Sequence, residues 1–366
     1  MRCSGVACSS STVLSVALHR GAEPVVVPFH HHALQAPRPL AGLRQCVAVL
    51  AVLTVTFPFF ALVLCGYVAT QARVLPLTAI GGLNSFVLFF ALPCMLYRFG
   101  ANTPIAQLLD PVVALIYLLC GLLVVAGAVA ATVRRWGWND AAFGALVTAF
   151  PNSGFMGVPL LVALLGPASA GPVIMTMALD MVVTTSLCIA LSRLGLGNGS
   201  AGRALRLALK GVLINPLPWA IGLGALASAT QFQLPGPVDK TIAMLADAAS
   251  PVALFTIGAV LARSQLNQAE HVAPRHYVPL ALAKLLLHPV LVWAACQAAL
   301  ALGAHLTPLT ITALVLTAAL PSASNVSLLA ERFEAHGGRV ARIILVSTAL
   351  AFVSFSAAVA WLTGGP

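Results

Sequence analysis

The sequence predicts an all-α polytopic membrane protein, and its composition and its long apolar segments are the observations that predict this fold class. Hydrophobic residues make up 60% of the 366 residues and charged residues only 8%, whereas soluble domains average about 45 to 50% and about 25%. So few charges cannot cover a folded surface of this size, and lipid must therefore contact much of it. The continuous apolar runs also differ from the alternating strands of about ten residues that a membrane barrel requires.

Ten segments are long and apolar enough to cross a bilayer core of about 30 Å as helices of about 20 residues. In chain order they are residues 46–70, 76–97, 111–133, 141–165, 171–191, 207–228, 241–262, 277–302, 309–329 and 340–363. The stretches between them are short loops.

The charges of these loops indicate how the helices are oriented. The 19 lysines and arginines that give the net charge of +10 are scattered between apolar runs, so they do not form the basic face of a nucleic-acid-binding protein. Almost all loop cations lie in the odd-numbered loops, whereas the even-numbered loops carry only Arg98 and Lys240. The positive-inside rule therefore places the odd loops in the cytoplasm and both ends of the helix bundle outside.

The two halves of the chain repeat each other. Aligning Pro58 with Pro216 also superimposes Gly66 on Gly224, and the sequence around Pro151 parallels the sequence around Pro321. Each half has five spans, an odd number, so the second copy enters the membrane in the opposite orientation. Such inverted repeats are the usual build of secondary transporters.

This repeat divides the chain into four parts. Residues 46–193 form the first five-helix repeat, 194–206 a basic cytoplasmic connector, and 207–366 the second five-helix repeat. Residues 1–45 contain no apolar run of span length, and we expect them to be a disordered or mis-assigned N-terminal extension. No cofactor and no metal are expected, because the tract of three histidines at 30–32 lacks further ligands at metal spacing.

Spans four and nine contain a dense group of residues that break helices. Proline removes one backbone hydrogen bond and clashes with the preceding turn, and a single proline in a span is most simply a kink. Here, however, Pro151 and Pro321 stand at matching places among glycine, serine and asparagine residues. A helix broken at the membrane midplane presents unpaired N–H groups and a positive dipole end, which favour a carboxylate. The predicted substrate-binding residues are Asn152, Ser153, Gly154, Ser322, Ser324 and Asn325.

The segment from Phe150-Pro151-Asn152 to Met156-Gly157-Val158-Pro159, together with Ala318-Ala319-Leu320-Pro321, resembles the auxin efflux carrier family and its bacterial malonate-permease-like members. The likeness runs over roughly residues 46–363. It implies ten spans as two inverted repeats, broken helices four and nine that cross, and elevator-like movement of spans three to five and eight to ten against the others. The family's crossover asparagine corresponds to Asn152, and its polar second crossing to Ser322 and Asn325.

The sequence departs from this family in two ways. It lacks the long cytoplasmic loop of the plant carriers, and its span nine is richer in serine. Auxin is therefore a poor guess for the substrate, whereas a bacterial cytoplasmic (inner) membrane location with periplasmic ends fits the resemblance.

Three ionisable residues inside predicted spans are candidates for a supporting or proton-coupling role. Asp180 lies mid-span in segment five, where a charged aspartate costs about 2.5 to 3.5 kcal/mol and must pair, face a cavity or carry a proton. Asp247 lies about two turns into span seven, where it either orients a break at Pro251 or makes a buried structural hydrogen bond. Lys284 in span eight either snorkels, pairs with one of these carboxylates or attracts the substrate.

These observations favour a secondary carrier or uniporter for small organic anions, such as malonate or a related carboxylate, by alternating access. An intramembrane enzyme or sensor on a transporter scaffold is the alternative, but Asp180, Lys284 and His288 are not accompanied by a nucleophile with a positioned base or by a set of metal ligands. We therefore expect no enzymatic activity. The expected partners are a small carboxylate and the lipid bilayer, with a homodimer as the candidate assembly.

Overall fold

The computed structural model describes residues 39–104, 110–194, 206, 210, 213–266 and 272–363, with side chains from residue 54 onward except residue 264. The chain divides into the units Met1–Gly42 and Leu43–Pro366, and the account below concerns the second. Of the predicted extension 1–45 only residues 39–45 are described, and they belong to the first helix. Most of the predicted connector 194–206 lies outside the described residues.

All regular secondary structure in the described part of the chain is helical. In chain order the α-helices are α1 (Pro39–Gln71), α2 (Ala79–Phe86), α3 (Leu92–Asn102), α5 (Pro111–Ala149), α6 (Val158–Leu165), α7 (Ala170–Leu179), α8 (Thr185–Ser192), α10 (Pro216–Thr230), α11 (Gly236–Leu266), α12 (Val278–Leu282), α13 (His288–Ala301), α14 (Pro308–Ala319), α15 (Val326–Arg332) and α16 (Gly337–Thr363). Short π-helical turns join several of them without a break: η1 (Val87–Ala91), η4 (Asp180–Thr184) and η7 (Ala283–Leu287). A fourth, η2 (Ser153–Gly157), leads directly into α6.

Seven helical stretches in the described residues are long and apolar enough to cross a membrane. They are Thr54–Gln71, Ala79–Asn102, Pro111–Ala149, Pro167–Ser192, Gly236–Arg263, Val278–Ala301 and Gly337–Thr363. Two shorter apolar helices, Ser153–Leu165 and Pro308–Ala319, accompany them. The long stretches agree with the all-α membrane fold class, and the short ones fall where the sequence predicts interrupted spans.

A polar cap followed by proline defines the start of three helices. The side chains of Asp110, Asn215 and Thr307 accept hydrogen bonds from backbone N–H groups in the first turns of α5, α10 and α14. A proline follows each of them at the first helical position, where its missing N–H leaves no bond unmade. The capped proline therefore sets where each of these helices begins.

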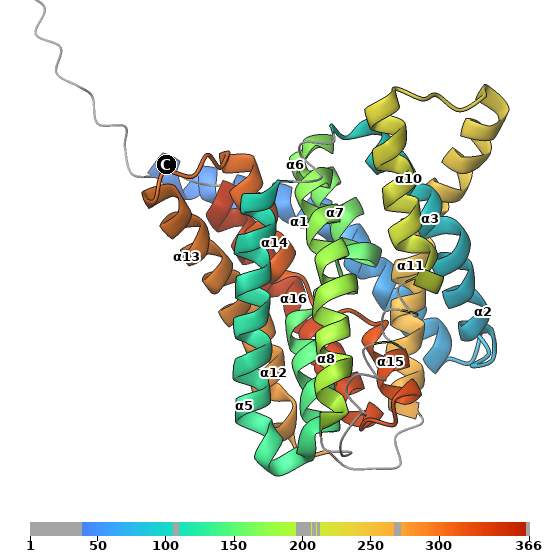
Figure 1. Cartoon of the computed structure of the whole chain (residues 1–366), viewed down its shortest axis with the longest axis vertical. Helices are drawn as coiled ribbons and strands as arrows, with labels where there is room; N and C mark the ends of the chain where they lie inside the picture. The colour runs from blue at the N-terminus through green and yellow to red at the C-terminus, as the bar shows by residue number, and fades with distance from the viewer. Residues whose placement is uncertain are drawn as a thin grey trace, which may run out of the picture. The chain divides into compact units, whose positions relative to one another are not determined.

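The predicted span three and the first part of the predicted span four are the two arms of α5, which turns sharply at its lower end in Figure 1. The turn lies at Gly137, whose φ of 76° is strained for residues with a Cβ. The short loop predicted between the spans is thus a bend centred on one glycine.

The helices pack in two groups, which Figure 1 shows on opposite sides of the bundle. In one group α3 packs against both α10 and α11. In the other, α5 packs against α7, α8 and α13, and α14 packs against α13, α7 and α16. This second group contains both arms of α5 and also α14, so it includes the two helices that the sequence predicts to be interrupted.

Glycine permits very close helix packing in the first group and between this group and α1. A Cβ at Gly258 of α11 would lie 1.8 Å from the carbonyl oxygen of Val63 in α1, and one at Gly66 would lie 1.9 Å from that of Phe255. A Cβ at Gly224 of α10 would lie 2.6 Å from the carbonyl oxygen of Tyr97. The backbones of α1 and α11, and of α3 and α10, are therefore in direct contact.

Substituting Gly258 by alanine is expected to destabilise the protein, because the new methyl group meets backbone atoms that cannot rotate away. Overpacking of this kind costs about 1 to 3 kcal/mol or more, and we expect the thermal midpoint in detergent to fall by about 5 °C or more. Gly222→Ala is the matched control, since a Cβ there meets nothing within 4 Å. Equal midpoints for the two variants and the parent would show that α1 and α11 do not pack this closely.

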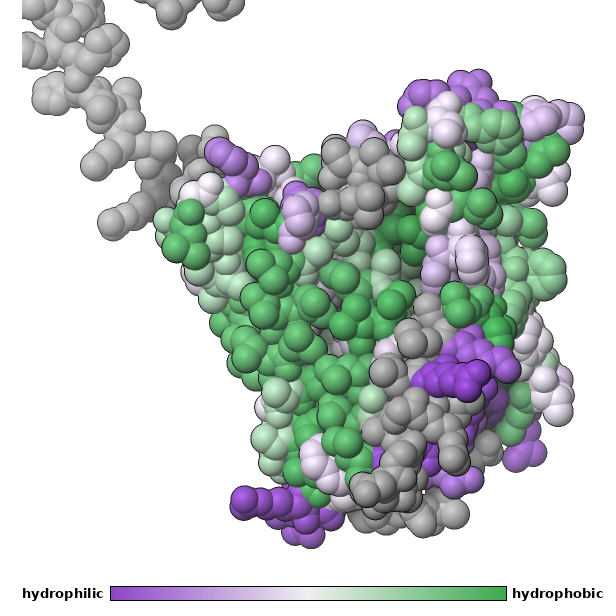
Figure 2. All heavy atoms as spheres, in the orientation of Figure 1, coloured by the Kyte–Doolittle hydropathy of each residue, from purple (hydrophilic) through white to green (hydrophobic). Residues whose placement is uncertain are grey.

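The surface of the second group suits contact with lipid. Leu115, Leu119 and Leu123 follow one face of α5 and are 51 to 61% exposed. Figure 2 shows a broad hydrophobic area over this side, with hydrophilic residues at the lower end of α5. This apolar belt lies between polar ends, as expected for a helix bundle in a bilayer.

Three of the odd-numbered loops meet at one end of the bundle. The guanidinium of Arg339 lies 3.2 Å from the Asp140 carboxylate and 3.9 Å above the Trp136 ring. Trp136 in turn contacts the ring of His276 edge-on. Residues from loops three, seven and nine are thus in direct contact, as their shared charge pattern predicts.

Candidate functional site

Both helix interruptions predicted from the sequence occur in the structure. Helix α5 ends at Ala149, Phe150 is extended, and the chain resumes a helix at Ser153. Helix α14 ends at Ala319, Leu320 is extended, and α15 begins at Val326. Neither segment faces lipid, because residues 149–153 and 319–324 are all buried.

The two interruptions cross each other and are joined by backbone hydrogen bonds. The N–H of Asn152 donates to the carbonyl of Pro321 at 2.8 Å, and the N–H of Ala323 donates to that of Phe150 at 3.0 Å. Pro151 and Ser322 thereby form an isolated antiparallel bridge. The crossing satisfies part of the backbone that the broken helices leave free, as a low-dielectric interior requires.

Three predicted site residues meet at one small cavity beside this crossing. Asn152, Gly154 and Asn325 line a space of about 20 Å³, together with side chains from η1, α3, α7 and α10. The Asn325 Oδ1 atom is buried without a hydrogen-bond partner among the described residues, and the Asn152 side chain is 5% exposed. A space of this size holds about one water molecule, so the crossing is nearly closed in this conformation.

The three predicted serines are buried but do not line this cavity. Ser153 and Ser322 are fully buried, and Ser324 is 5% exposed. The N–H of Ser322 donates to Ser347 Oγ of α16 at 3.1 Å, a partner that sequence reasoning missed. The serines therefore lie within the crossing rather than on its cavity side.

A larger cavity of about 430 Å³ reaches the crossing from the end that carries the odd loops. Phe150 and Asn325 line both cavities, and the larger one extends to Arg193 at the end of α8 and Arg332 at the end of α15. A small organic molecule fits this space, whereas it does not fit the small cavity alone.

Behind the crossing, Asp180 lies in a buried polar cluster. Its carboxylate accepts hydrogen bonds from Tyr117 Oη at 2.6 Å and from Thr184 Oγ1 at 3.0 Å. The side chains of Asp180 and Tyr117 are each 1% exposed. The predicted residue Asp180 is thus paired with polar groups rather than facing lipid.

Lys284 belongs to the same cluster and contacts the end of the broken helix α14. Its Nζ atom donates to the carbonyl of Ala318 at 2.6 Å and lies 3.3 Å from Nδ1 of His288. The rings of His288 and Tyr117 are 5.9 Å apart, and Lys284 and Asp180 are close enough to interact electrostatically. Lys284 is fully buried, which excludes snorkelling to the membrane surface.

The π-helical turns place these two ionisable residues. Asp180 begins η4 and Lys284 lies in η7, and a third such turn, η2, follows Asn152. A π turn adds one residue to the helical repeat and is often found at functional sites. It redirects a polar side chain into the protein without ending the helix.

Comparison with known families decides what kind of protein carries this site. The profile described as "Membrane transport protein" matches residues 51–196 and 201–359, which is most of the chain. The chain belongs to the membrane transport protein family. This is the auxin efflux carrier type of transporter that the proline and asparagine pattern resembles, and the resemblance is confirmed.

Curated relatives of this transporter come from several bacteria. A "Putative malonate transporter" of Rhizobium meliloti (strain 1021) is 28% identical over 299 residues, which cover 80% of this chain and 90% of the relative. The "Uncharacterized transporter YfdV" of Escherichia coli (strain K12) is 27% identical over 216 residues, covering 58% of this chain and 65% of the relative. The protein of the same name in Shigella flexneri matches to the same extent.

Asp247 does not belong to the crossing or to the cluster of this transporter. It lies on the exposed face of α11, and its carboxylate is 3.6 Å from the guanidinium of Arg98. Helix α11 continues through Pro251 without a break. The expectations that Asp247 orients a break or makes a buried hydrogen bond are therefore wrong, because neither the break nor the burial exists.

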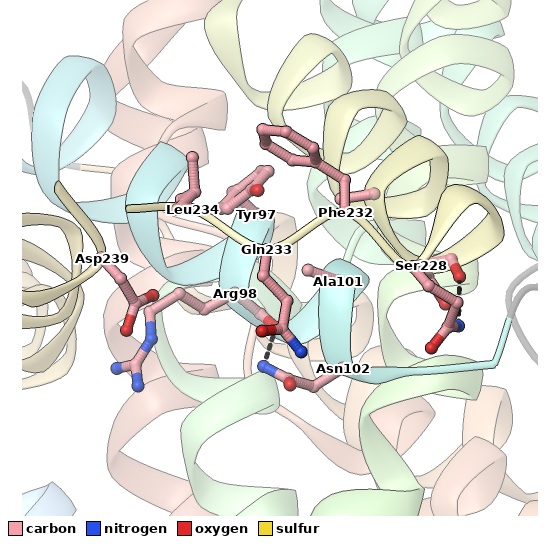
Figure 3. Close-up of a pocket in the computed structure, with 11 residues that line it drawn as sticks. Tyr97, Arg98, Ala101, Asn102, Ser228, Phe232, Gln233, Leu234 and Asp239 are labelled. Carbon is pink, nitrogen blue, oxygen red and sulfur yellow. Dashed lines mark hydrogen bonds between the residues drawn. The ribbon is translucent and has the colours of Figure 1, made fainter. Parts of the chain in front are cut away.

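A separate polar pocket lies between α3, α10 and the start of α11 (Figure 3). Arg98, Asn102 and Asp239 reach into it together with Gln233, and Asn102 donates a hydrogen bond to the Arg98 carbonyl. None of the predicted site residues lines this pocket. Its mixture of a cation, a carboxylate and amides gives no preference for an anion, so the crossing remains the candidate site.

Sequence reasoning missed Tyr117 and the two cavity-lining arginines of this transporter. Tyr117 is a phenol in a continuous apolar run, and a buried tyrosine hydroxyl usually needs a partner, so that signal was present. Arg193 and Arg332 are among the odd-loop cations that predict orientation, and their sequence positions do not reveal that they face a cavity. Among the described residues no group of three or more histidine, cysteine, aspartate or glutamate side chains could hold a metal ion.

Proposed function

We propose that the protein is a secondary active transporter or uniporter that moves small organic anions across the cytoplasmic membrane by elevator-type alternating access. Malonate and related carboxylates are the proposed substrates. Membership of the membrane transport protein family supports a role in transport. The similarity of the chain to a protein named as a putative malonate transporter supports this substrate class.

The observation that carries the proposal is the pair of asparagines at the crossing. Asn152 and Asn325 come from different halves of the chain and line the same cavity, and no hydrogen bond occupies either side chain among the described residues. The helix that starts at Ser153 begins beside the same cavity, which its residue Gly154 lines, so its positive dipole end lies there. Amide donors and a positive dipole end together favour a carboxylate, although the site itself carries no full positive charge.

Ten spans in two inverted repeats are part of the proposal. The crossing pairs Pro151 with Ser322, the residue that follows the equivalent proline of the other half, and this supports the proposed repeat. The close contacts at Gly66 and Gly224 support it as well, since the first span of each half packs against the second span of the other. These four spans are the proposed scaffold, and the helices around the crossing are the proposed moving unit.

The orientation follows from the charges. The cavity of about 430 Å³ opens toward the arginines of loops five and nine, so the proposed cytoplasmic side is the open side of this conformation. Both ends of the bundle are then periplasmic, in the inner membrane of a bacterium. A homodimer is the proposed assembly, and light scattering of the purified protein in detergent tests it.

The proposed site is tested by uptake of labelled malonate into proteoliposomes. Asn152→Ala and Asn325→Ala are each expected to lower the initial rate at least tenfold, because each removes an amide donor from a nearly dry cavity. Asn198→Ala in the predicted connector is the control and is expected to leave the rate unchanged. Equal uptake by both site variants and the parent rejects the site, and no uptake of any carboxylate by the parent rejects the proposed substrate class.

A further inference from the structure

The polar pocket of Figure 3 adjoins a larger apolar groove between α3, α10 and α11. The pocket has a volume of about 340 Å³ and the groove about 640 Å³. Both are lined by Tyr97, Ala227, Phe232 and Leu234. Figure 3 shows the charged ends of Arg98 and Asp239 on one side of the pocket and the Phe232 ring on the opposite side. The two hollows therefore adjoin as one space with a charged end and an apolar end.

This space has the length of one lipid leaflet. Leu223 and Leu226 of α10 line the apolar groove and are 57% and 59% exposed. Along α10 the groove and the pocket together extend from Ala220 to Gln231, which is roughly 16 Å at about 1.5 Å per residue. Half of a bilayer core of about 30 Å is about 15 Å. An acyl chain in the groove would thus reach from the polar pocket to the membrane midplane.

The polar pocket lies at the ends of membrane-crossing helices, which is the depth of a lipid headgroup. The stretch Ala79–Asn102 ends at a residue that lines the pocket, and α10 ends at Thr230, just before Gln231. The stretch Gly236–Arg263 begins beside it, with Asp239 of its first turn in the lining. In the proposed orientation this is the periplasmic leaflet.

The charges at the pocket suit a headgroup that carries both signs. The Arg98 guanidinium lies 3.6 Å from the Asp247 carboxylate, but a guanidinium has five N–H donors, so others remain for a phosphate. The Asp239 carboxylate makes no hydrogen bond or ion pair with any residue that the structure describes. It is therefore free to pair with an ammonium group. A purely anionic headgroup would meet two carboxylates and one guanidinium.

We propose that this space binds a zwitterionic phospholipid. Its phosphate binds Arg98, its ammonium group binds Asp239, and one acyl chain lies in the apolar groove against Leu223 and Leu226. The lipid then joins α3, α10 and α11, the helices of the first group. An apolar face of a second copy of the chain would cover the groove but leave the charged pocket unfilled, whereas a phospholipid fills both. This inference does not depend on which substrate the protein transports.

The test is a lipid titration of the full-length protein, purified in detergent and stripped of lipid, with native mass spectrometry as the readout. The probes are dioleoyl phosphatidylethanolamine, dioleoyl phosphatidylglycerol and glycerophosphoethanolamine, which is the headgroup without acyl chains. The zwitterionic lipid is expected to bind at least tenfold more tightly than either of the other two. Equal binding of the anionic lipid overturns the role of Asp239, and equal binding of the free headgroup overturns the role of the groove.

Variants then assign the two ends of the headgroup. Asp239→Asn and Arg98→Gln are each expected to raise the Kd for phosphatidylethanolamine about tenfold or more, because each removes a charged hydrogen-bond partner. Asp247→Asn removes the ion-pair partner of Arg98 but lines neither hollow, and its Kd should stay within threefold of the parent. Parental affinity in Asp239→Asn would contradict the proposal. Thermal midpoints measured without lipid show that the variants are folded.

Filling the groove tests the position of the acyl chain. Thr230 lines the groove and is exposed, so Thr230→Trp places a large side chain in the groove without entering the core. Binding of phosphatidylethanolamine is expected to fall at least tenfold in this variant. The same spectra report the oligomeric state. If Thr230→Trp separates a dimer and leaves lipid binding as in the parent, a second copy occupies the groove and the proposal is overturned.

Discussion

Replacing Lys284 by methionine is expected to lower carboxylate uptake about 100-fold or more. The ammonium group of Lys284 donates to the carbonyl of Ala318, which lies at the end of α14 just before the crossing. That helix end carries a partial negative charge and carbonyl groups without helical partners. Methionine has a similar length but carries neither a charge nor a hydrogen-bond donor. The Ala318 carbonyl at the end of α14 therefore loses its hydrogen bond from Lys284.

The expected magnitude follows from the surroundings of this contact. A buried acceptor left without a donor costs about 1 to 3 kcal/mol, and a partly buried cation at a helix C-terminus contributes up to about 2 kcal/mol. Together they reach about 3 kcal/mol or more, and a factor of 100 corresponds to about 2.7 kcal/mol. We expect the loss to distort the crossing, because Ala318 is separated from Pro321 by only two residues.

Initial uptake rates of labelled malonate in proteoliposomes, normalised to reconstituted protein, provide the measurement. Lys240→Met is the matched control, since Lys240 is exposed in the first part of α11. Lys284→Gln keeps a hydrogen-bond donor without the charge, and it is expected to recover less than a tenth of the parental rate. Uptake by Lys284→Met within threefold of the parent would mean that the ammonium group is not needed at this helix end.

The interrupted helices could be predicted from the sequence because proline acts locally. Pro151 and Pro321 remove backbone donors wherever the side chains point, and the neighbouring Asn152 and Asn325 can replace lost hydrogen bonds. The equivalent places of the two prolines in the two halves also predicted that they belong together. The structure adds that the two segments bond directly to each other.

The contents of the polar cluster could not be predicted in the same way. Lys284, Asp180 and Tyr117 lie far apart in the sequence, and their meeting depends on the packing of α5 with η4 and η7. The π turns shift the helical register by one residue, which no periodic pattern in the sequence reveals. The prediction for Asp247 failed for the opposite reason. Its position two turns into a span suggested burial, but it lies on an exposed face of its helix.

The sequence could not show which arginines line the cavities, because that depends on the direction in which each side chain points. The arginines of the odd loops predicted orientation, which depends only on their position along the chain. Which of them faces a cavity depends on the helix face, and Arg193 and Arg332 line the cavity that reaches Asn325. Position along the chain was therefore predictable, whereas the choice of face required the fold.

Asp180→Asn is expected to abolish accumulation driven by a pH gradient while leaving exchange of substrate across the membrane. Asp180 is buried and accepts hydrogen bonds from Tyr117 and Thr184, and a carboxyl group at this depth can lose its charge by binding a proton. Asparagine has the same shape and keeps an acceptor oxygen, but it cannot bind and release a proton. The folded cluster is therefore retained without its titratable carboxyl group.

Two assays on the same proteoliposomes separate coupling from movement. With an acidic exterior, the parent is expected to accumulate labelled malonate at least tenfold above its level without a gradient, and Asp180→Asn is expected to show no such increase. In counterflow, where unlabelled malonate inside exchanges for labelled malonate outside, the variant should stay within threefold of the parent. Asp247→Asn is the matched control, because this carboxylate is also within a span but is exposed and paired with Arg98.

The combination of results distinguishes a coupling residue from a structural one. Loss of both accumulation and counterflow in Asp180→Asn would assign the carboxylate to the structure of the cluster, and Tyr117→Phe should then lose both as well, since it removes the hydroxyl that bonds Asp180. Accumulation equal to the parent would show that the driving proton does not bind at Asp180. Retained counterflow with lost accumulation is the result we expect, because moving the loaded site needs the hydrogen bonds of the cluster, whereas coupling to a pH gradient needs a group that titrates.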